Sequence, residues 1–175
     1  MLRILAKQAK PLEGTVHHAS GIKIGYFDQV AVDSLLAVSD VHINCISYLA
    51  ERFATKTEQD IRGELTSFGL GPAQATTSIQ FLSGGERSRL CLVNLMLENP
   101  PVLFLDNPTS NLDVESVEAL AYGLNRWNGT LVIVSHDANF IRSLDCKCYV
   151  IIPKEGKLRR VEGGIDAYLK AFTVY

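Results

Sequence analysis

The spacing of apolar positions changes several times along the chain, and each spacing predicts a different kind of element. Two continuous apolar runs, 102–105 and 131–134, are typical of strands that are covered on both faces. Alternation over 22–27 predicts a third strand, and 15–19 is a shorter candidate. Apolar residues three or four positions apart predict helices over 1–10, 42–52, 57–68, 86–98, 114–127, 139–144 and 164–172.

The order of these elements predicts the fold class. Buried strands that alternate with helices indicate a mostly parallel sheet with right-handed crossovers, and therefore an α/β fold. Near the C-terminus, 149–152 and 158–161 are expected to pair as a hairpin, which the last helix follows. A chain of 175 residues, 47% of them hydrophobic, is long enough for one domain with its own core.

Composition and charge narrow the classes of function. A net charge of −2 gives no sign of a protein that binds a polyanion over its whole surface. Cys45, Cys91, Cys146 and Cys148 form no C-x-x-C pair, so we expect free thiols, the last two within a strand. No apolar run approaches the roughly 20 residues that span a bilayer, and the N-terminus is too short and polar for a signal peptide. These features predict a soluble, cytoplasmic protein.

The sequence SGGE at 83–86 combines a helix start with two glycines. Ser83 and Glu86 have the spacing of a capping box, so a helix is expected to begin here. Gly84 and Gly85 each cost a helix about 1 kcal/mol relative to alanine. That cost is understandable if bare backbone amides approach a phosphate at the positive end of the helix. On its own, the motif is equally compatible with a helix start that has a flexible lead-in.

Two chemically useful side chains follow the predicted buried strands. Asp106 ends the first of them and His136 comes just after the second. Open α/β sheets place ligand chemistry at the carboxyl ends of their strands. There an aspartate can hold Mg²⁺ and a histidine can hydrogen-bond a terminal phosphate. The alternatives are a helix cap for Asp106 and a structural imidazole for His136.

The motifs form a more specific pattern when they are taken in order. A glutamine at a strand end, LSGGE, a strand that ends in aspartate, SNLD and SHD follow one another along the chain. This order resembles the nucleotide-binding domain of ATP-binding cassette (ABC) proteins over nearly the whole sequence. The resemblance matches Gln29 to the Q-loop, 83–86 to the signature motif, 102–106 to the Walker B strand and His136 to the switch histidine. The residues that match the D-loop are Ser110, Asn111, Leu112 and Asp113.

Glu86 and the ending at 162–169 resemble the ABC-F subfamily, and the chain is most similar to a second cassette of that subfamily. In ABC-F proteins two cassettes lie in one chain without membrane domains, and known members mostly act on ribosomes. The resemblance implies a P-loop NTPase-like cassette fragment with a mostly parallel sheet, an inserted helical subdomain and a C-terminal hairpin plus helix. It divides the single domain at 1–175 into 1–29 up to the Q-loop, 30–95 with the helical subdomain and signature, and 96–175 from Walker B onward.

The resemblance also implies ATP and Mg²⁺ as cofactors and a second cassette as partner. In the family, each ATP lies between the Walker A motif of one cassette and the signature of the other. Asp106 and Gln29 would hold Mg²⁺, partly through water, and His136 would contact the γ-phosphate of the same ATP. The residues that would serve ATP on the partner are Ser83, Gly84, Gly85 and Glu86.

The sequence departs from the family at three points. It contains no Walker A motif, G-x-x-x-x-G-K-[ST], and the family has this motif just before the helix that opens the chain. We therefore interpret the chain as a cassette truncated after Walker A, and expect marginal stability and weak binding of ATP. Asn107 replaces the catalytic glutamate, which accepts a proton from the attacking water. Asn111 stands where ABC-F members commonly have histidine.

The function that these observations favour is ATP binding and hydrolysis in a complete cassette pair, associated with the ribosome. A second alternative, a non-hydrolysing regulatory or binding module, is supported by Asn107 and the missing Walker A motif. A third alternative, the cassette of a membrane transporter, disagrees with the ABC-F-like ending. A small basic group near the hairpin suits either ribosomal RNA or solvent. It consists of Lys154, Lys157, Arg159 and Arg160.

Overall fold

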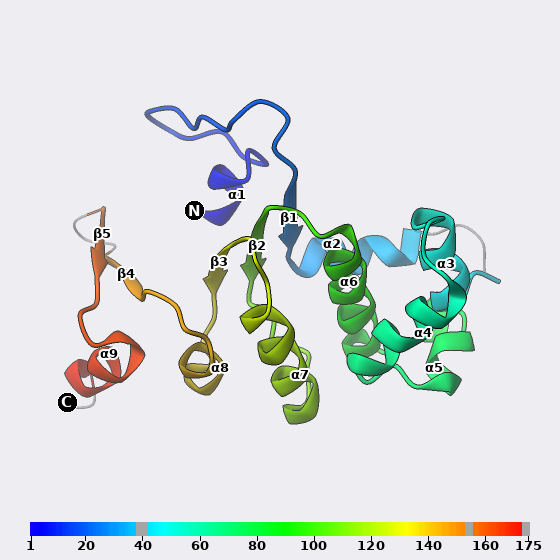
Figure 1. The fold of residues 1–175 in the computed structure, drawn as a ribbon. Helices are drawn as coiled ribbons and strands as arrows, with labels where there is room; N and C mark the ends of the chain where they lie inside the picture. The colour runs from blue at the N-terminus through cyan, green and yellow to red at the C-terminus, as the bar shows by residue number, and fades with distance from the viewer. Residues whose placement is uncertain (38–41, 153–155, 173–175) are drawn as a thin grey trace.

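A computed structural model describes residues 1–37, 42–152 and 156–172 of the chain (Figure 1). Its strands are β1 (Ile24–Phe27), β2 (Val102–Asp106), β3 (Thr130–Val134), β4 (Tyr149–Ile152) and β5 (Lys157–Arg160). Its helices are α1 (Leu2–Leu5), α2 (Gln29–Ser34), α3 (Cys45–Arg52), α4 (Glu58–Ser67), α5 (Pro72–Thr76), α6 (Gly84–Glu98), α7 (Val114–Asn125), α8 (Ala138–Ser143) and α9 (Gly164–Phe172). Two 3-10 turns are η1 (Leu35–Ala37) and η2 (Ile79–Phe81).

The sheet in the middle of the molecule is parallel, with the strand order β1–β2–β3. Its register pairs Tyr26 with Phe104 and Leu105 with Ile133. Because the strands run in the same direction, their carboxyl ends come together at one edge of the sheet. This arrangement confirms the predicted α/β fold with a mostly parallel sheet.

The two continuous apolar strands differ in burial. In β2, Leu103, Phe104 and Leu105 are at most 6% exposed, as predicted for a strand covered on both faces. In β3, Thr130 is exposed and the remaining residues are only half-buried. Among the described strands β3 pairs with β2 alone, so its other edge is open. The prediction of a buried strand is therefore right for β2 and wrong for β3.

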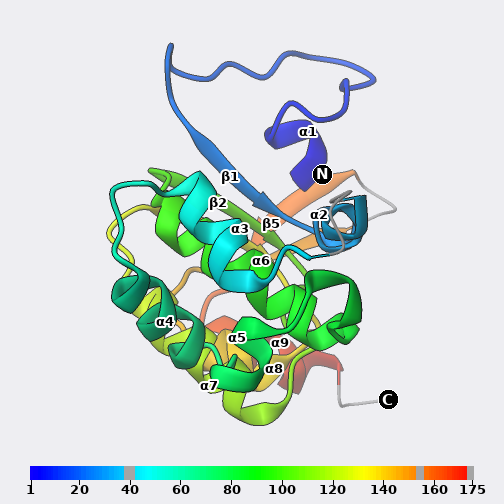
Figure 2. The same ribbon diagram turned by 90° about the vertical axis from the view of Figure 1, so that its right-hand side faces the viewer.

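Helices α3, α4 and α5 gather beside α6, on the side of the sheet away from the hairpin (Figures 1 and 2). α3 packs against α4 and α5, and α4 packs against α6. The start of α4 is fixed locally, since Thr57 and Asp60 form the predicted capping box there. The core between them includes the fully buried side chains of Leu49, Ile61, Leu65 and Leu90.

The C-terminal region contains the predicted hairpin and closing helix. β4 and β5 pair antiparallel, with Tyr149 opposite Arg160 and Ile151 opposite Leu158. α9 follows and packs against α8. Lys154, which belongs to the basic group noted in the sequence, lies outside the described residues.

The cysteines are free thiols, as the sequence predicts. Burial raises the pKa of Cys45 to about 11 and that of Cys91 to about 12, so both stay protonated. Cys146 and Cys148 precede the hairpin, because pairing between its strands begins only at Tyr149. Their predicted position within a strand is wrong.

Two predicted elements near the N-terminus are shortened or absent. α1 ends at Leu5, and soon afterwards Lys7 takes a left-handed backbone conformation with φ 58°, which a continuing helix cannot contain. The strand expected over 15–19 is a loop, because no described strand lies alongside to share its backbone hydrogen bonds. Instead, the ring of His18 is hydrogen-bonded to the Leu5 carbonyl at 2.7 Å.

Candidate functional site

A polar pocket of about 300 Å³ lies where the carboxyl ends of β1 and β2 meet the loop after β2. Ligand sites of open α/β sheets occur at this edge, because the connections leave the sheet there. The pocket brings together five residues that the sequence assigns to a site, namely Gln29, Asp106, Asn107, Ser110 and Asn111. The other lining residues are Arg3, Phe27 and Asp28.

An ion pair forms one wall of this pocket. The Arg3 guanidinium donates a hydrogen bond to Asp28 at 2.8 Å, and Asp28 also accepts the backbone N–H of Ala31 at 2.9 Å, which caps α2. Beside this pair, the Tyr26 hydroxyl is buried without a well-aligned hydrogen bond to any described residue, and burial raises its pKa. Arg3 thus adds a positive charge that the sequence analysis did not assign to the site.

The donor chemistry of the pocket fits Mg²⁺. Asp106 ends β2 and Gln29 opens α2, so a carboxylate and an amide oxygen line the same space. The Gln29 Oε1 atom accepts a hydrogen bond from Asn111 at 3.1 Å, which leaves its second lone pair for another partner. Among the described residues no group of three or more His, Cys, Asp or Glu side chains is arranged for a metal. A small number of protein ligands is enough for Mg²⁺, because the ion keeps several of its waters.

Asn107 has an unusual backbone. Its φ is 49°, in the left-handed region, where asparagine is found several times more often than most residues. Its N–H donates to the Val134 carbonyl at 2.8 Å, and its own carbonyl accepts the Ser110 hydroxyl at 3.0 Å. These bonds fix the backbone of Asn107 between β3 and the loop after β2, and the residue lines the pocket.

His136 lies apart from the pocket. It occupies the loop between β3 and α8, where its side chain is exposed, and it does not line the pocket. Its neighbours are fixed, because the Asp137 N–H donates to Ser135 Oγ at 3.0 Å and Asp137 caps α8. The structure therefore does not bring His136 together with Asp106 and Gln29.

The SGGE sequence starts α6 with the capping box that its spacing predicts. The Ser83 N–H donates to Glu86 at 2.7 Å, and the Glu86 N–H donates to Ser83 Oγ at 3.2 Å. The bond from the Ser83 backbone is the main reason why the pKa of Glu86 is lowered. Ser83 and Gly84 are exposed, so the positive end of α6 faces outward and is accessible to an anion.

The start of α6 lies directly on the loop at 110–113. A Cβ atom on Gly85 would come within 2.6 Å of the backbone oxygen of Asn111, so this position has no room for a side chain. One turn further along, Arg89 donates to Ser116 at 3.2 Å and pairs with Asp113 at 3.5 Å. Sequence reasoning missed Arg89, because nothing in its local pattern indicates partners that are 24 and 27 residues away.

Comparison with known families identifies this arrangement. The sequence profile of the family described as ABC transporter matches residues 1–110. The chain belongs to this family. The predicted resemblance to ABC cassettes is confirmed.

The curated relatives of this cassette include ABC-F proteins, which confirms the predicted resemblance to that subfamily. The cassette is 38% identical over 168 residues to rat "ATP-binding cassette sub-family F member 3". It is 36% identical over 168 residues to the Saccharomyces cerevisiae protein GCN20. Each match covers 96% of this chain, but only 23% of the rat protein and 22% of the yeast protein. The activities of those whole proteins are therefore not observations on this chain.

Solved structures of ABC cassettes share the fold. A dimeric ATP-binding cassette in a post-hydrolysis state with ADP and Pi has a TM-score of 0.66 at 22% identity, covering 93% of this chain and 79% of that one. The structure titled "RNase-L Inhibitor" has a TM-score of 0.74 at 19% identity, covering 97% of this chain and 34% of that one. At these identities the likeness concerns the fold alone. Within the described parts of the cassette, no helix is long and apolar enough to cross a bilayer.

The contact between the start of α6 and the loop at 110–113 leads to a prediction. Gly85→Ala is expected to lower the free energy of unfolding by about 1–3 kcal/mol, the usual cost of overpacking, because the rigid backbone of Asn111 must move. Gly84→Ala is the matched control, since no atom lies within 4 Å of a Cβ there and alanine favours the helix. Urea unfolding followed by circular dichroism measures both changes. Equal stabilities for the two variants would contradict the close contact between Gly85 and the Asn111 backbone.

Proposed function

We propose that the chain is an ABC-F-type cassette that binds ATP with Mg²⁺ at a junction with a second cassette and, in the complete pair, takes part in its hydrolysis. The observation that carries this proposal is the close contact of Gly85 with Asn111. This contact holds the outward-facing signature next to the pocket that contains Asp106. Groups suited to two different nucleotides are thus joined in one rigid unit.

In its own site, the cassette would act mainly through Asp106, Gln29 and His136. Bound Mg²⁺ supplies positive charge that neutralises the phosphate oxygens of ATP. The Asp106 carboxylate and the Gln29 amide oxygen hold the ion, partly through water. His136 donates a hydrogen bond to the terminal phosphate, which requires its loop to approach the pocket. Asn107 orients water through its amide but takes no proton, and loss of a general base typically slows a reaction about 10²–10⁴-fold.

In the site of its partner, the cassette would act through its signature. The exposed helix start at Ser83 and Gly84 offers backbone N–H groups and a positive dipole end to phosphate. Glu86 belongs to this unit, because it holds the Ser83 backbone in the capping box. The D-loop residues Ser110, Asn111, Leu112 and Asp113 set the distance between this surface and the pocket. The dimeric cassette with a similar fold supports a second cassette as the partner.

The proposal divides the chain by role. Residues 1–29 lead to the Q-loop, 30–95 form a helical subdomain with the signature, and 96–175 run from the Walker B strand to the C-terminus. The grouping of α3, α4 and α5 beside α6 supports the middle unit (Figure 2).

We further propose that the partner of the cassette pair is the ribosome, in the cytoplasm. Sequence similarity to "ATP-binding cassette sub-family F member 3" and to GCN20 supports this choice. The exposed side chains of Lys157, Arg159 and Arg160 on β5 offer positive charge for phosphate groups of RNA.

A second candidate function is a non-hydrolysing binding module. The left-handed backbone of Asn107 favours it, because asparagine fits this conformation and a glutamate there would be strained. The position is thus compatible with a neutral residue that retains ATP rather than one that promotes its hydrolysis.

The proposal is tested first by titrating Mg-ATP onto the purified 175-residue chain in a calorimeter. We expect binding weaker than micromolar, because the sequence contains no G-x-x-x-x-G-K-[ST] to hold the phosphates. Asp106→Asn is the matched variant, and should weaken any residual Mg²⁺-dependent heat. Micromolar affinity for the unaltered chain would contradict the idea that it binds ATP poorly on its own and only completes the site of another cassette.

Two further measurements separate the candidate functions. Phosphate release from a complete cassette pair distinguishes hydrolysis from retention of ATP. Co-sedimentation of the chain with ribosomes, compared with membrane vesicles, tests the proposed partner. Pelleting with vesicles alone would favour a transporter cassette instead.

A further inference from the structure

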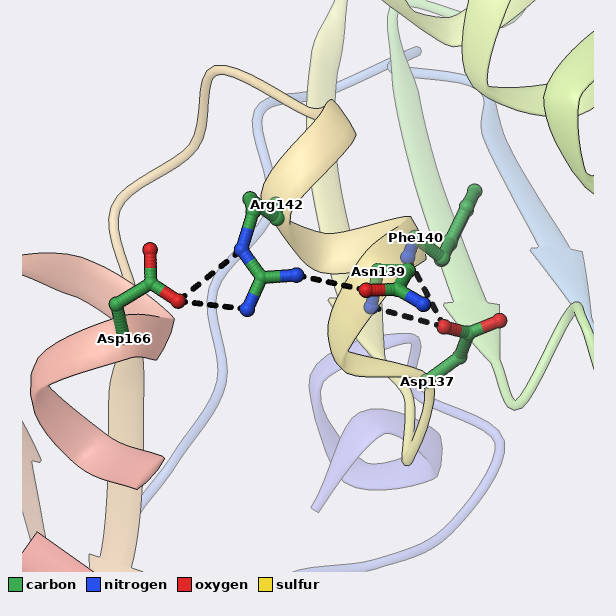
Figure 3. A network of polar contacts seen from close by, with 5 residues as sticks. All are labelled: Asp137, Asn139, Phe140, Arg142 and Asp166. Atoms are coloured by element: carbon green, nitrogen blue, oxygen red, sulfur yellow. Dashed lines mark hydrogen bonds and ion pairs between the residues drawn. The ribbon is translucent and has the colours of Figure 1, made fainter. Parts of the chain in front are cut away.

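A network of polar contacts joins the C-terminal helix to the helix that follows the switch histidine. Arg142 of α8 donates to Asp166 of α9 through Nε at 3.0 Å and through Nη2 at 2.6 Å (Figure 3). The same guanidinium donates to Asn139 through Nη1 at 2.7 Å. One side chain therefore connects the first turn of α9 with the first turn of α8.

The first turn of α8 is in turn connected to the loop of His136. The Asp137 carboxylate accepts the backbone N–H groups of Asn139 and Phe140, both at 3.0 Å (Figure 3). The Asp137 N–H donates to Ser135. His136 thus lies between two residues whose positions depend on how α8 begins.

α8 is suited to transmit a displacement because one of its faces is buried in the core and the other contacts α9. Phe140 is 1% exposed and Leu144 is 7% exposed, and both anchor the helix in the core. Arg142 lies between them in sequence and is directed to the opposite side, toward Asp166 (Figure 3). A pull on Arg142 would tilt or rotate a short helix about its buried face, and the Asp137 cap would move with it.

We propose that Arg142 is a positioning residue, through which the C-terminal helix α9 sets the position of the His136 loop. Binding or displacement of α9 by a partner of the cassette would then reach the switch histidine without contact with the pocket. The consequence for hydrolysis rests on the proposed function, whereas the link between α9 and the loop is a property of the protein without nucleotide.

The geometry of the pair supports this role. A single exposed ion pair contributes little unless its geometry is favourable or it belongs to a network. Here the guanidinium donates twice to one oxygen of Asp166 and once more to Asn139, so hydrogen bonds hold three of its nitrogens on two acceptors. The hydrogen bond from Arg142 also lowers the pKa of Asp166, because the neighbouring cation favours the charged carboxylate.

The experiment is hydrogen–deuterium exchange on the whole chain without nucleotide, comparing the unaltered protein with Asp166→Asn. We expect the Asn139 and Phe140 amides to exchange about two- to five-fold faster, the range that corresponds to an exposed ion pair. Glu58→Gln is the matched control, because Glu58 and Arg62 form a pair of similar exposure within α4. That variant should leave α8 unchanged.

A second readout follows His136 directly. The ring resonance of His136, assigned with His136→Gln, is expected to shift in Asp166→Asn, while those of His17 and His18 stay in place. Asp166→Glu keeps the charge and should restore most of the original signal. Faster exchange in α9 without any change in α8 or in the His136 resonance would overturn the proposal. Failure of the proposed function would show instead in the ATP and phosphate measurements, which this experiment does not use.

Discussion

Replacing Phe140 with alanine is expected to lower the free energy of unfolding by about 3–5 kcal/mol. The Phe140 ring is 1% exposed and anchors α8 in the core. Its removal forfeits the burial of the ring and leaves a cavity that the short helix fills poorly. The total free energy of unfolding of a typical domain is only about 5–15 kcal/mol, so the variant should lose a large share of its stability.

Phe81→Ala is the matched control for Phe140→Ala. Phe81 is also a phenylalanine at a helical turn, but its side chain is 77% exposed. Its truncation should change the stability by no more than about 0.5 kcal/mol. Urea unfolding followed by circular dichroism compares the variants. A similar small change for both would mean that α8 is not anchored through Phe140.

Leu105→Ala is expected to lower the free energy of unfolding by about 2–5 kcal/mol. Leu105 is completely buried at the centre of the sheet, where it pairs with Phe27 on β1 and with Ile133 on β3. A cavity at this point removes contacts on both sides of β2. Because Asp106 follows directly, the edge of the pocket should also become less well ordered.

The control for the sheet variant is Leu12→Ala. The Leu12 side chain is fully exposed in the loop between α1 and β1, so its loss should have almost no effect on unfolding. Both variants are measured in urea under the same conditions, with the unaltered chain alongside. If Leu105→Ala unfolds at the same urea concentration as Leu12→Ala, the packing of β2 described above is wrong.

The sequence predicted best those features that depend on residues close together in the chain. Ser83 with Glu86, and Thr57 with Asp60, form capping boxes because each pair lies three residues apart. Asp113 starts α7 as expected, for the same reason. Such contacts can be recognised from spacing alone, since the backbone of a helix fixes the distance between its own first residues.

The failures concern features that depend on distant partners. The residues at 15–19 have a strand-like composition, but no described strand lies beside them. β3 has an apolar run similar to that of β2, yet it is less buried, and among the described strands it pairs with β2 alone. Composition shows that a segment can form a strand, whereas its pairing and burial depend on which other segments the fold places beside it.

In the candidate site, too, the sequence predicted motif residues but missed those that depend on distant partners. The pocket residues Gln29, Asp106 and Asn111 were assigned from motif order, and the structure brings them together. Arg3 and Arg89 were missed, since their partners Asp28 and Asp113 lie 25 and 24 residues away. His136 was assigned to the same site, but its loop lies outside the pocket in this structure.

The sequence around Asn107 has a consequence for the chemical ageing of the protein. An asparagine slowly becomes an acid when the backbone nitrogen of the next residue attacks its side-chain amide, a reaction that requires a hydrogen on that nitrogen. Asn107 is followed by Pro108, which has none. Asn128, exposed and followed by Gly129, lacks this protection. Spontaneous deamidation by this route therefore does not put a carboxylate in place of the neutral Asn107 amide beside Asp106.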